Sequence, residues 1–209
     1  MNVVTSIDPA PRRPNLCSVA VGAEHVLVSP EAVVRLGLRV GRELDAVELG
    51  ALRHEGEVQR VIDRALRMLA FRARSSAELR RGLALKGERG AEVDVALARL
   101  LAAGVLDDEA FGRQFARSRL GGGAVGRSRV VRELVVRGLD HESAEGAVRE
   151  AADDEGVSEG ESAERAARKK LRSLGGLEPA VRRRRLYGFL ARRGFAHDEI
   201  SRVLRSLDV

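Results

Sequence analysis

The stretch LVVRGLDHESAEGAV, residues 134–148, contains the pattern that decides the fold. Apolar residues stand eight and four positions before its glycine, Gly138, and six and ten positions after it. They are Val130, Leu134, Ala144 and Val148. Because side chains four apart share one helix face, the spacing predicts two amphipathic helices joined by a short turn. A glycine suits that turn because it adopts the left-handed conformation that ends a helix.

The same spacing recurs around two other glycines, Gly87 and Gly194. The matching residues are Leu79, Leu83, Val93 and Leu97 for the first glycine, and Leu186, Leu190, Ile200 and Leu204 for the second. A further helix is expected before each pair, at residues 61–73, 109–120 and 162–174. The repeat predicts an all-α fold of three tandem three-helix units, stacked into an elongated, curved modular rod.

The N-terminal part lacks this periodicity. Residues 1–15 hold three prolines and are expected to form a disordered tail. Residues 16–57 are expected to form a small extension with a β-hairpin, at 18–21 and 26–29, and short helices capped by Ser29 and Asp45. The predicted boundaries that follow are helical unit 1 at 58–110, helical unit 2 at 111–155, a linker at 156–161 and helical unit 3 at 162–209.

Composition narrows the class of protein. Aromatic residues make up 3% of the 209 residues, Trp is absent, and charged residues make up 33%, a balance typical of amphipathic helices. The single cysteine, Cys17, excludes a disulfide framework or a cysteine-based zinc site. No apolar run reaches the length of about 18 residues that a membrane-spanning helix needs. We therefore expect a soluble, cytoplasmic protein.

Charge alternates along the repeat. Residues 58–86 hold eight basic and two acidic residues, residues 111–137 hold seven and one, and residues 163–209 hold thirteen and five. The intervening segments, 87–110 and 138–162, are acidic. The net charge of +6 favours a polyanionic partner, and basic helices on one surface can follow a charged polymer. Solvated faces that pair between units would give the same alternation.

Acidic clusters occur where helices are expected to begin. Asp140, His141 and Glu142 follow Gly138, and Asp107, Asp108 and Glu109 precede residues 109–120. Carboxylates in a first helical turn oppose the positive end of the helix dipole, so capping is favoured over metal or acid–base chemistry.

The string GGGAVG at 121–126 lacks the Lys-Ser/Thr ending of a phosphate-binding loop and follows a helix, so it is interpreted as a flexible connector. We expect no catalytic residue, no metal ligand and no cofactor.

Arginines are the best candidates for function, because a guanidinium binds carboxylates and phosphates in a bidentate manner. The candidates for partner or DNA binding are Arg127, Arg129, Arg132, Arg137, Arg182, Arg183, Arg184, Arg185, Arg192 and Arg193. Tyr187, beside the second group, is suited either to stacking on a base or to half-buried packing.

Three motifs resemble the RecX family of bacterial regulators of the RecA recombinase. They are SSAELRRGLALKG, GVLDDEAF and GRSRVVRELVVRGL, in family order and spacing. The resemblance covers about residues 58–209, and residues 19–53 are similar to the N-terminal extension of many members. One departure is the polar sequence after Gly87, where members usually place an apolar residue.

The resemblance implies a function. RecX-like proteins are not enzymes; they bind the RecA–single-stranded-DNA filament in its helical groove and suppress ATP hydrolysis, strand exchange and coprotease activity. It implies that this chain is a monomer whose partners are the RecA filament and, by weak direct contact, single-stranded DNA. It also implies a role in homologous recombination, DNA repair and the SOS response. The alternative is an autonomous DNA-binding transcriptional regulator with helix-turn-helix-like units.

Overall fold

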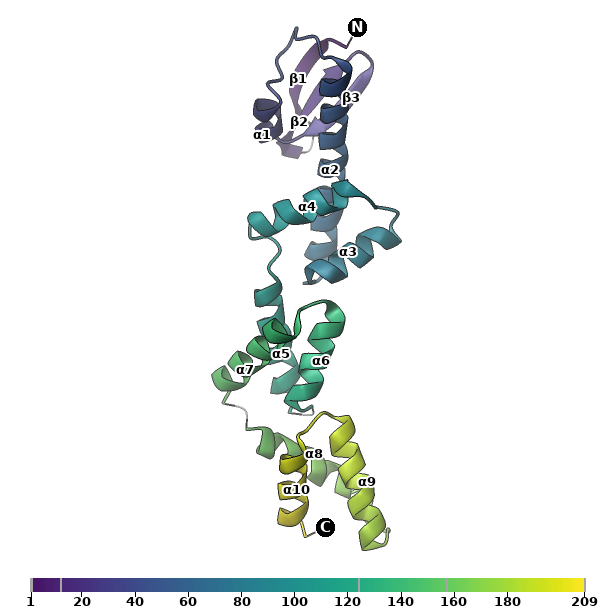
Figure 1. The fold of residues 1–209 in the computed structure, drawn as a ribbon, viewed down its shortest axis with the longest axis vertical. Coiled ribbons are helices and arrows are strands. Elements are labelled where there is room, and N and C mark those ends of the chain that lie inside the picture. Colours follow the sequence, from purple (N-terminus) through teal and green to yellow (C-terminus); the bar gives the residue numbers. More distant parts are fainter. Residues whose placement is uncertain (1, 12, 124, 157, 209) are drawn as a thin grey trace. The chain divides into compact units, whose positions relative to one another are not determined.

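The computed structural model describes residues 2–11, 13–123, 125–156 and 158–208 (Figure 1). It divides the chain into two compact bodies. The first body contains Met1–Ala73 and Leu79–Leu106, and the second contains Arg74–Glu78 and Asp107–Val209. The described residues are mostly helical, with a small antiparallel sheet near the N-terminus.

The N-terminal sheet corrects the prediction of a disordered tail at residues 1–15. Its strands are β1 (Val4–Ala10), β2 (Arg13–Val21) and β3 (Glu24–Val28), in the order β1-β2-β3. The predicted hairpin is confirmed as β2 and β3, and β1 pairs antiparallel with β2. Pro9 obscured β1, but an edge strand tolerates a proline because one side of its backbone has no ladder partner.

The helix after the sheet is longer than expected. Ser29 caps α1 (Pro30–Arg35) as predicted. Asp45 caps α2 (Ala46–Phe71), but α2 runs for 26 residues where a short helix was expected. The predicted boundary between residues 57 and 58 therefore falls inside one helix. The first half of α2 contributes to the core beneath the sheet, and its second half contributes to the core of the first three-helix unit.

The three-helix units are confirmed. The first contains the second half of α2 with α3 (Ser76–Leu85) and α4 (Ala91–Ala102). The second contains α5 (Asp108–Gly121), α6 (Arg127–Arg137) and α7 (His141–Asp154), and the third contains α8 (Glu159–Leu171), α9 (Pro179–Arg192) and α10 (His197–Ser206). Two boundaries move, since α5 begins before residue 111 and α8 begins inside the predicted linker at 156–161.

Each three-helix unit has its own hydrophobic core. The twelve apolar residues that the repeat singled out all lie in these cores, and none is more than 3% exposed. Full burial of an aliphatic side chain contributes roughly 1.5–3 kcal/mol to folding. The repeat therefore marks the positions at which the three units are stabilised in the same way.

The three glycines form the same helix-ending turn. Their φ angles are +85° at Gly87, +107° at Gly138 and +84° at Gly194. In each turn the amide of the following residue donates to a carbonyl five residues back, and the glycine amide donates to a carbonyl three residues back. This is the Schellman motif, which a hydrophobic residue after the glycine usually completes.

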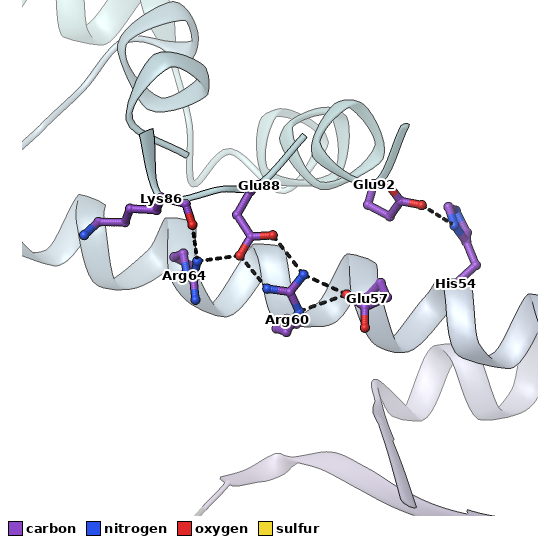
Figure 2. A network of polar contacts seen from close by, with 7 residues as sticks. All are labelled: His54, Glu57, Arg60, Arg64, Lys86, Glu88 and Glu92. Atoms are coloured by element: carbon purple, nitrogen blue, oxygen red, sulfur yellow. Dashed lines mark hydrogen bonds and ion pairs between the residues drawn. The ribbon is translucent and has the colours of Figure 1, made fainter. Parts of the chain in front are cut away.

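The residue after the glycine is apolar in two units and charged in one. Leu139 and Phe195 are each 5% exposed, and so is the carboxylate-bearing Glu88 in the first unit. Figure 2 shows how Glu88 is compensated: Arg60 and Arg64 of α2 both contact its carboxylate. The polar sequence after Gly87 is thus accommodated by an ion-pair network, because a buried charge needs a partner.

Candidate protein and nucleic-acid interface

A repeated joint within the second body fixes its helices. Ser75, which is fully buried, accepts a hydrogen bond from the Glu78 amide and donates its own hydroxyl to the Arg137 carbonyl, at 2.6 Å. The Gly126 amide donates to the Arg193 carbonyl, at 2.8 Å. Ser75 and Gly126 each lie twelve residues before the glycine of their own repeat, so the two joints are equivalent.

The receiving side of each joint is the glycine turn. A Cβ atom on Gly138 would lie 2.1 Å from the Cβ of Ala77, and one on Gly194 would lie 2.6 Å from the backbone nitrogen of Arg129. A Cβ on Gly87 would meet no atom of the described residues within 4 Å. There, the carbonyl before the glycine accepts a hydrogen bond from Arg64 of α2 instead, at 3.0 Å (Figure 2).

The joint corrects the interpretation of GGGAVG as a flexible connector. Gly126 is the N-cap of α6 and is held by the Arg193 carbonyl. A Cβ on Gly126 would lie 2.2 Å from the Gly194 oxygen, so the position requires a glycine for close backbone approach. Ala124, within this string, lies outside the described residues.

The second joint brings arginines of two repeats together. Arg129, Arg132 and Arg137 of α6 line a shallow hollow of about 400 Å³ with Arg192 of α9. Arg129 also donates to the Arg192 carbonyl, at 3.2 Å. Four of the ten arginines proposed from the sequence therefore share one surface, which we call the α6–α9 hollow.

Some of the proposed arginines have structural contacts. Arg137 donates to Glu78 at 2.7 Å and lies over the ring of Phe115, 4.5 Å from its centroid. Arg127 lies 3.8 Å from Glu159, and Arg193 lies over the ring of Phe189. These contacts hold the second body together.

The α6–α9 hollow also contains Glu133. Burial raises the pKa of its carboxyl, but hydrogen bonds from Arg119 and Arg129 outweigh this effect, so the pKa lies below its ordinary value. Glu133 is therefore ionised at neutral pH and partly neutralises the hollow. Beside it, Val136 is 77% exposed. A surface that mixes both charges with exposed apolar area is typical of a protein-binding site.

Other proposed arginines remain available to a partner. Within the described ranges, the exposed Arg132, Arg184, Arg185 and Arg192 form no ion pair. Arg182 and Arg183 lie in the first turns of α9, apart from the residues that line the hollow. The structure thus separates arginines with internal contacts, such as Arg137, from the exposed Arg132, Arg184, Arg185 and Arg192.

The acidic clusters act as caps. Asp140 accepts from the Ser143 amide at 2.8 Å, a hydrogen bond that lowers the pKa of its carboxyl, and Asp107 accepts from the Ala110 amide. Asp108 accepts from the Ser76 amide at 2.7 Å, so it caps α3 across the first joint. Among the described residues there is no group of three or more His, Cys, Asp or Glu side chains able to hold a metal ion.

Tyr187 has an intramolecular partner. Its hydroxyl lies 2.9 Å from Nδ1 of His197, and the two rings meet edge to face. The side chain is 37% exposed. The contact joins α9 to the start of α10 and favours the packing alternative for this residue.

Three cations that the sequence analysis did not select gather elsewhere. Arg165, Lys169 and Lys170 of α8 line a second hollow with Phe189 and Arg193. The basic run at 168–170 was visible in the sequence. Its spacing alone does not show which of these cations share a face with a neighbouring helix.

These features define a helical repeat protein built of three-helix units with basic, solvent-exposed helix faces. In the described part of the chain, no helix is long and apolar enough to cross a membrane.

Comparisons with known proteins show to which family this helical repeat protein belongs. The model of the first three-helix domain of RecX matches residues 62–100, and that of the third three-helix domain matches residues 158–204. The regulatory protein RecX of Pelodictyon phaeoclathratiforme is 38% identical over 146 residues, which cover 68% of this chain and 86% of the relative. That of Mycolicibacterium vanbaalenii is 37% identical over 157 residues, covering 72% and 83%. The chain belongs to the RecX family of regulatory proteins.

A solved structure agrees in fold. A crystal structure of a regulatory protein RecX superimposes with a TM-score of 0.81 at 17% identity, covering 97% of this chain and 98% of the other. The likeness at this identity confirms the arrangement of a small N-terminal sheet followed by tandem three-helix units.

Proposed function

We propose that this protein binds the RecA–single-stranded-DNA filament and inhibits its ATPase, strand-exchange and coprotease activities without catalysing a reaction. Membership of the RecX family supports a regulatory role. The observation that carries the proposal is the α6–α9 hollow, where two repeats present exposed arginines on one surface. A protein that presents arginines from successive repeats on one surface suits a charged filament whose own surface repeats.

The chemistry of the α6–α9 hollow favours contact with the RecA protein. Arg132 and Arg192 are available for carboxylates, and Val136 offers apolar area beside them. Glu133 would repel a phosphate placed in the same hollow. The protein acts in this proposal as a cytoplasmic monomer in recombination and the SOS response, with single-stranded DNA contacted weakly.

The test is a titration of the protein into RecA that is hydrolysing ATP on single-stranded DNA. We expect inhibition by the natural chain and at least tenfold weaker inhibition by the charge-reversed variant Arg132→Glu with Arg192→Glu. Arg149→Glu is the matched control, because Arg149 is exposed on α7 and does not line the hollow. Unchanged ATPase at stoichiometric amounts of the natural chain would refute the proposal.

The alternative function is a transcriptional regulator that reads DNA with its helix pairs. In a helix-turn-helix the second helix places its N-terminal residues against base edges. Here the first turn of α7 holds Glu142 and follows Asp140, and the first turn of α10 holds Asp198 and Glu199. These carboxylates disfavour entry into a groove lined by phosphates. Competition between a specific operator and random DNA distinguishes the two functions.

A further inference from the structure

The second hollow lies where the second and third three-helix units meet. Its volume is about 430 Å³. One wall is Gly122 and Gly123 at the end of α5, and the other walls come from α8 and α9. Among the described residues, four cationic side chains line it and no carboxylate does. They are Arg165, Lys169, Lys170 and Arg193.

The cations of this hollow are held in place by short-range contacts. The Phe189 ring lies 5.7 Å from Nζ of Lys170 and 4.6 Å from Cζ of Arg193, both over the ring face. A Cβ on Gly123 would lie 3.2 Å from Nη1 of Arg165, so the glycine leaves room for that guanidinium. The ring and the glycine loop therefore position cations from two helices around one space.

This concentration of positive charge is unfavourable without an anion. Arg165 and Lys169 are four residues apart on α8, a spacing at which like charges repel. Neither forms an ion pair within the described ranges, whereas their neighbour Arg168 pairs with Glu164, one helical turn earlier. A negatively charged ligand in the hollow would relieve the repulsion.

We propose that this hollow is a second binding site, which holds backbone phosphates of single-stranded nucleic acid. The proposal rests on the proposed function and divides it between two surfaces. The α6–α9 hollow contains a carboxylate and exposed apolar area and contacts protein. The hollow around Phe189 has only cations as its charged lining among the described residues, and it contacts phosphate. Its cations recognise charge and not base identity, so binding is independent of sequence.

The position of the site links phosphate binding to the second joint. Arg193 supplies a side chain to the hollow and its carbonyl to the Gly126 amide. A phosphate held between α8 and α9 therefore also holds Arg193, whose carbonyl accepts the hydrogen bond from Gly126 at the N-cap of α6. Occupancy should increase protection of the Gly126 amide from hydrogen exchange.

The test measures direct binding of fluorescent oligo(dT) to the full chain without RecA, over a range of salt concentrations. Each phosphate contact contributes about 0.7 to the slope of log K against log salt for a single strand. Arg165→Ala with Lys169→Ala should reduce the slope by about 1.4 and weaken binding at least tenfold. The control is Arg168→Ala, which removes one charge from the same helix outside the hollow.

Further measurements distinguish a nucleic-acid ligand from a small polyphosphate, and the phosphate site from the proposed RecA contact. Phe189→Leu preserves apolar bulk and should weaken oligonucleotide binding several-fold by releasing two cations. Inorganic tripolyphosphate should compete only weakly, and equal affinity for it and for oligo(dT) would overturn the polymer assignment. Unchanged oligo(dT) binding by the variant with Arg165→Ala and Lys169→Ala, or an equal loss of binding in the control Arg168→Ala, would overturn the proposed site. Loss of RecA inhibition in the Arg132 and Arg192 variant, with oligonucleotide binding kept, supports the division into two surfaces.

Discussion

Alanine substitution of the three repeat glycines should give unequal losses of stability. All three have positive φ, so each Gly→Ala change places a side chain in the left-handed region, at a cost of about 1–2 kcal/mol. At Gly87 this conformational cost is the whole loss, because a Cβ there would lie in open space. At Gly138 and Gly194 the Cβ collides with Ala77 and with the backbone of Arg129.

These collisions determine how much further stability Gly138→Ala and Gly194→Ala lose. A 2.1 Å approach to the Cβ of Ala77 cannot be relieved by rotating a flexible side chain, so the backbone must move apart. Overpacking of this kind costs about 1–3 kcal/mol. The movement also weakens the hydrogen bond between Ser75 and the Arg137 carbonyl, which contributes about 1 kcal/mol. The totals are therefore about 1–2 kcal/mol for Gly87→Ala and about 3–6 kcal/mol for Gly138→Ala.

Two measurements check this difference. Urea unfolding followed by circular dichroism gives the relative losses, and amide exchange at Gly126 reports on the second joint alone. Gly194→Ala should abolish protection of the Gly126 amide, which donates to the Arg193 carbonyl, and Gly87→Ala should leave it unchanged. Equal losses in the three variants, or an unchanged Gly126 amide in Gly194→Ala, would refute the reasoning.

Three other predictions test local interactions, at Glu88, at Glu55 and at the Ser75–Ser76 pair. Glu88→Leu should change the unfolding free energy by less than about 1 kcal/mol, because the equivalent residues of the other two units, Leu139 and Phe195, are apolar. Glu88→Lys should lower it by about 3–5 kcal/mol, because it reverses a buried, paired charge. Urea unfolding of the two variants measures this difference, and equal losses would contradict this account. The hydrogen bond from Arg99 holds the pKa of Glu55 below its ordinary 4.5, although burial opposes it. Its folded pKa lies below the unfolded one, so this stabilisation is present above about pH 4.5 and is lost as the pH falls through the lowered pKa. Melting temperatures between pH 6 and 3 should therefore fall less steeply in Glu55→Gln, and identical slopes would exclude the contribution. Ser75→Ala should cost about 1–2 kcal/mol by removing a cap and a joint contact, while Ser76→Ala should cost nothing, since its buried hydroxyl has no hydrogen-bond partner among the described residues; thermal melts that rank them in the opposite order would disprove the assignment.

The sequence predicted what side-chain periodicity encodes. The twelve apolar positions are buried because burial follows the 3.6-residue repeat, and Asp140 and Asp107 cap helices because short carboxylates satisfy free amides. The length of α2 was missed because its second half belongs to a different core, so the helix was divided where the apolar face changes partner.

Contacts made by the backbone were not predictable. The bond from Gly126 to the Arg193 carbonyl joins residues 67 apart through groups that every sequence possesses. β1 was missed for the same reason, since its pairing uses backbone groups and its proline, Pro9, suggested disorder. Arginine runs identified a basic surface but did not separate Arg137, which holds Glu78, from Arg132, which forms no ion pair with any described residue.

The joint has a direction. A position twelve residues before one glycine docks on the turn of the following unit, and the first turn is already occupied by Arg64. In the third unit the same position is Arg182, whose buried Nε has no hydrogen-bond partner in the described chain. Modular lengthening by gene duplication would therefore proceed from one end only: a designed fourth module would find a donor after the third unit, whereas a module placed ahead of the first would have to displace Arg64.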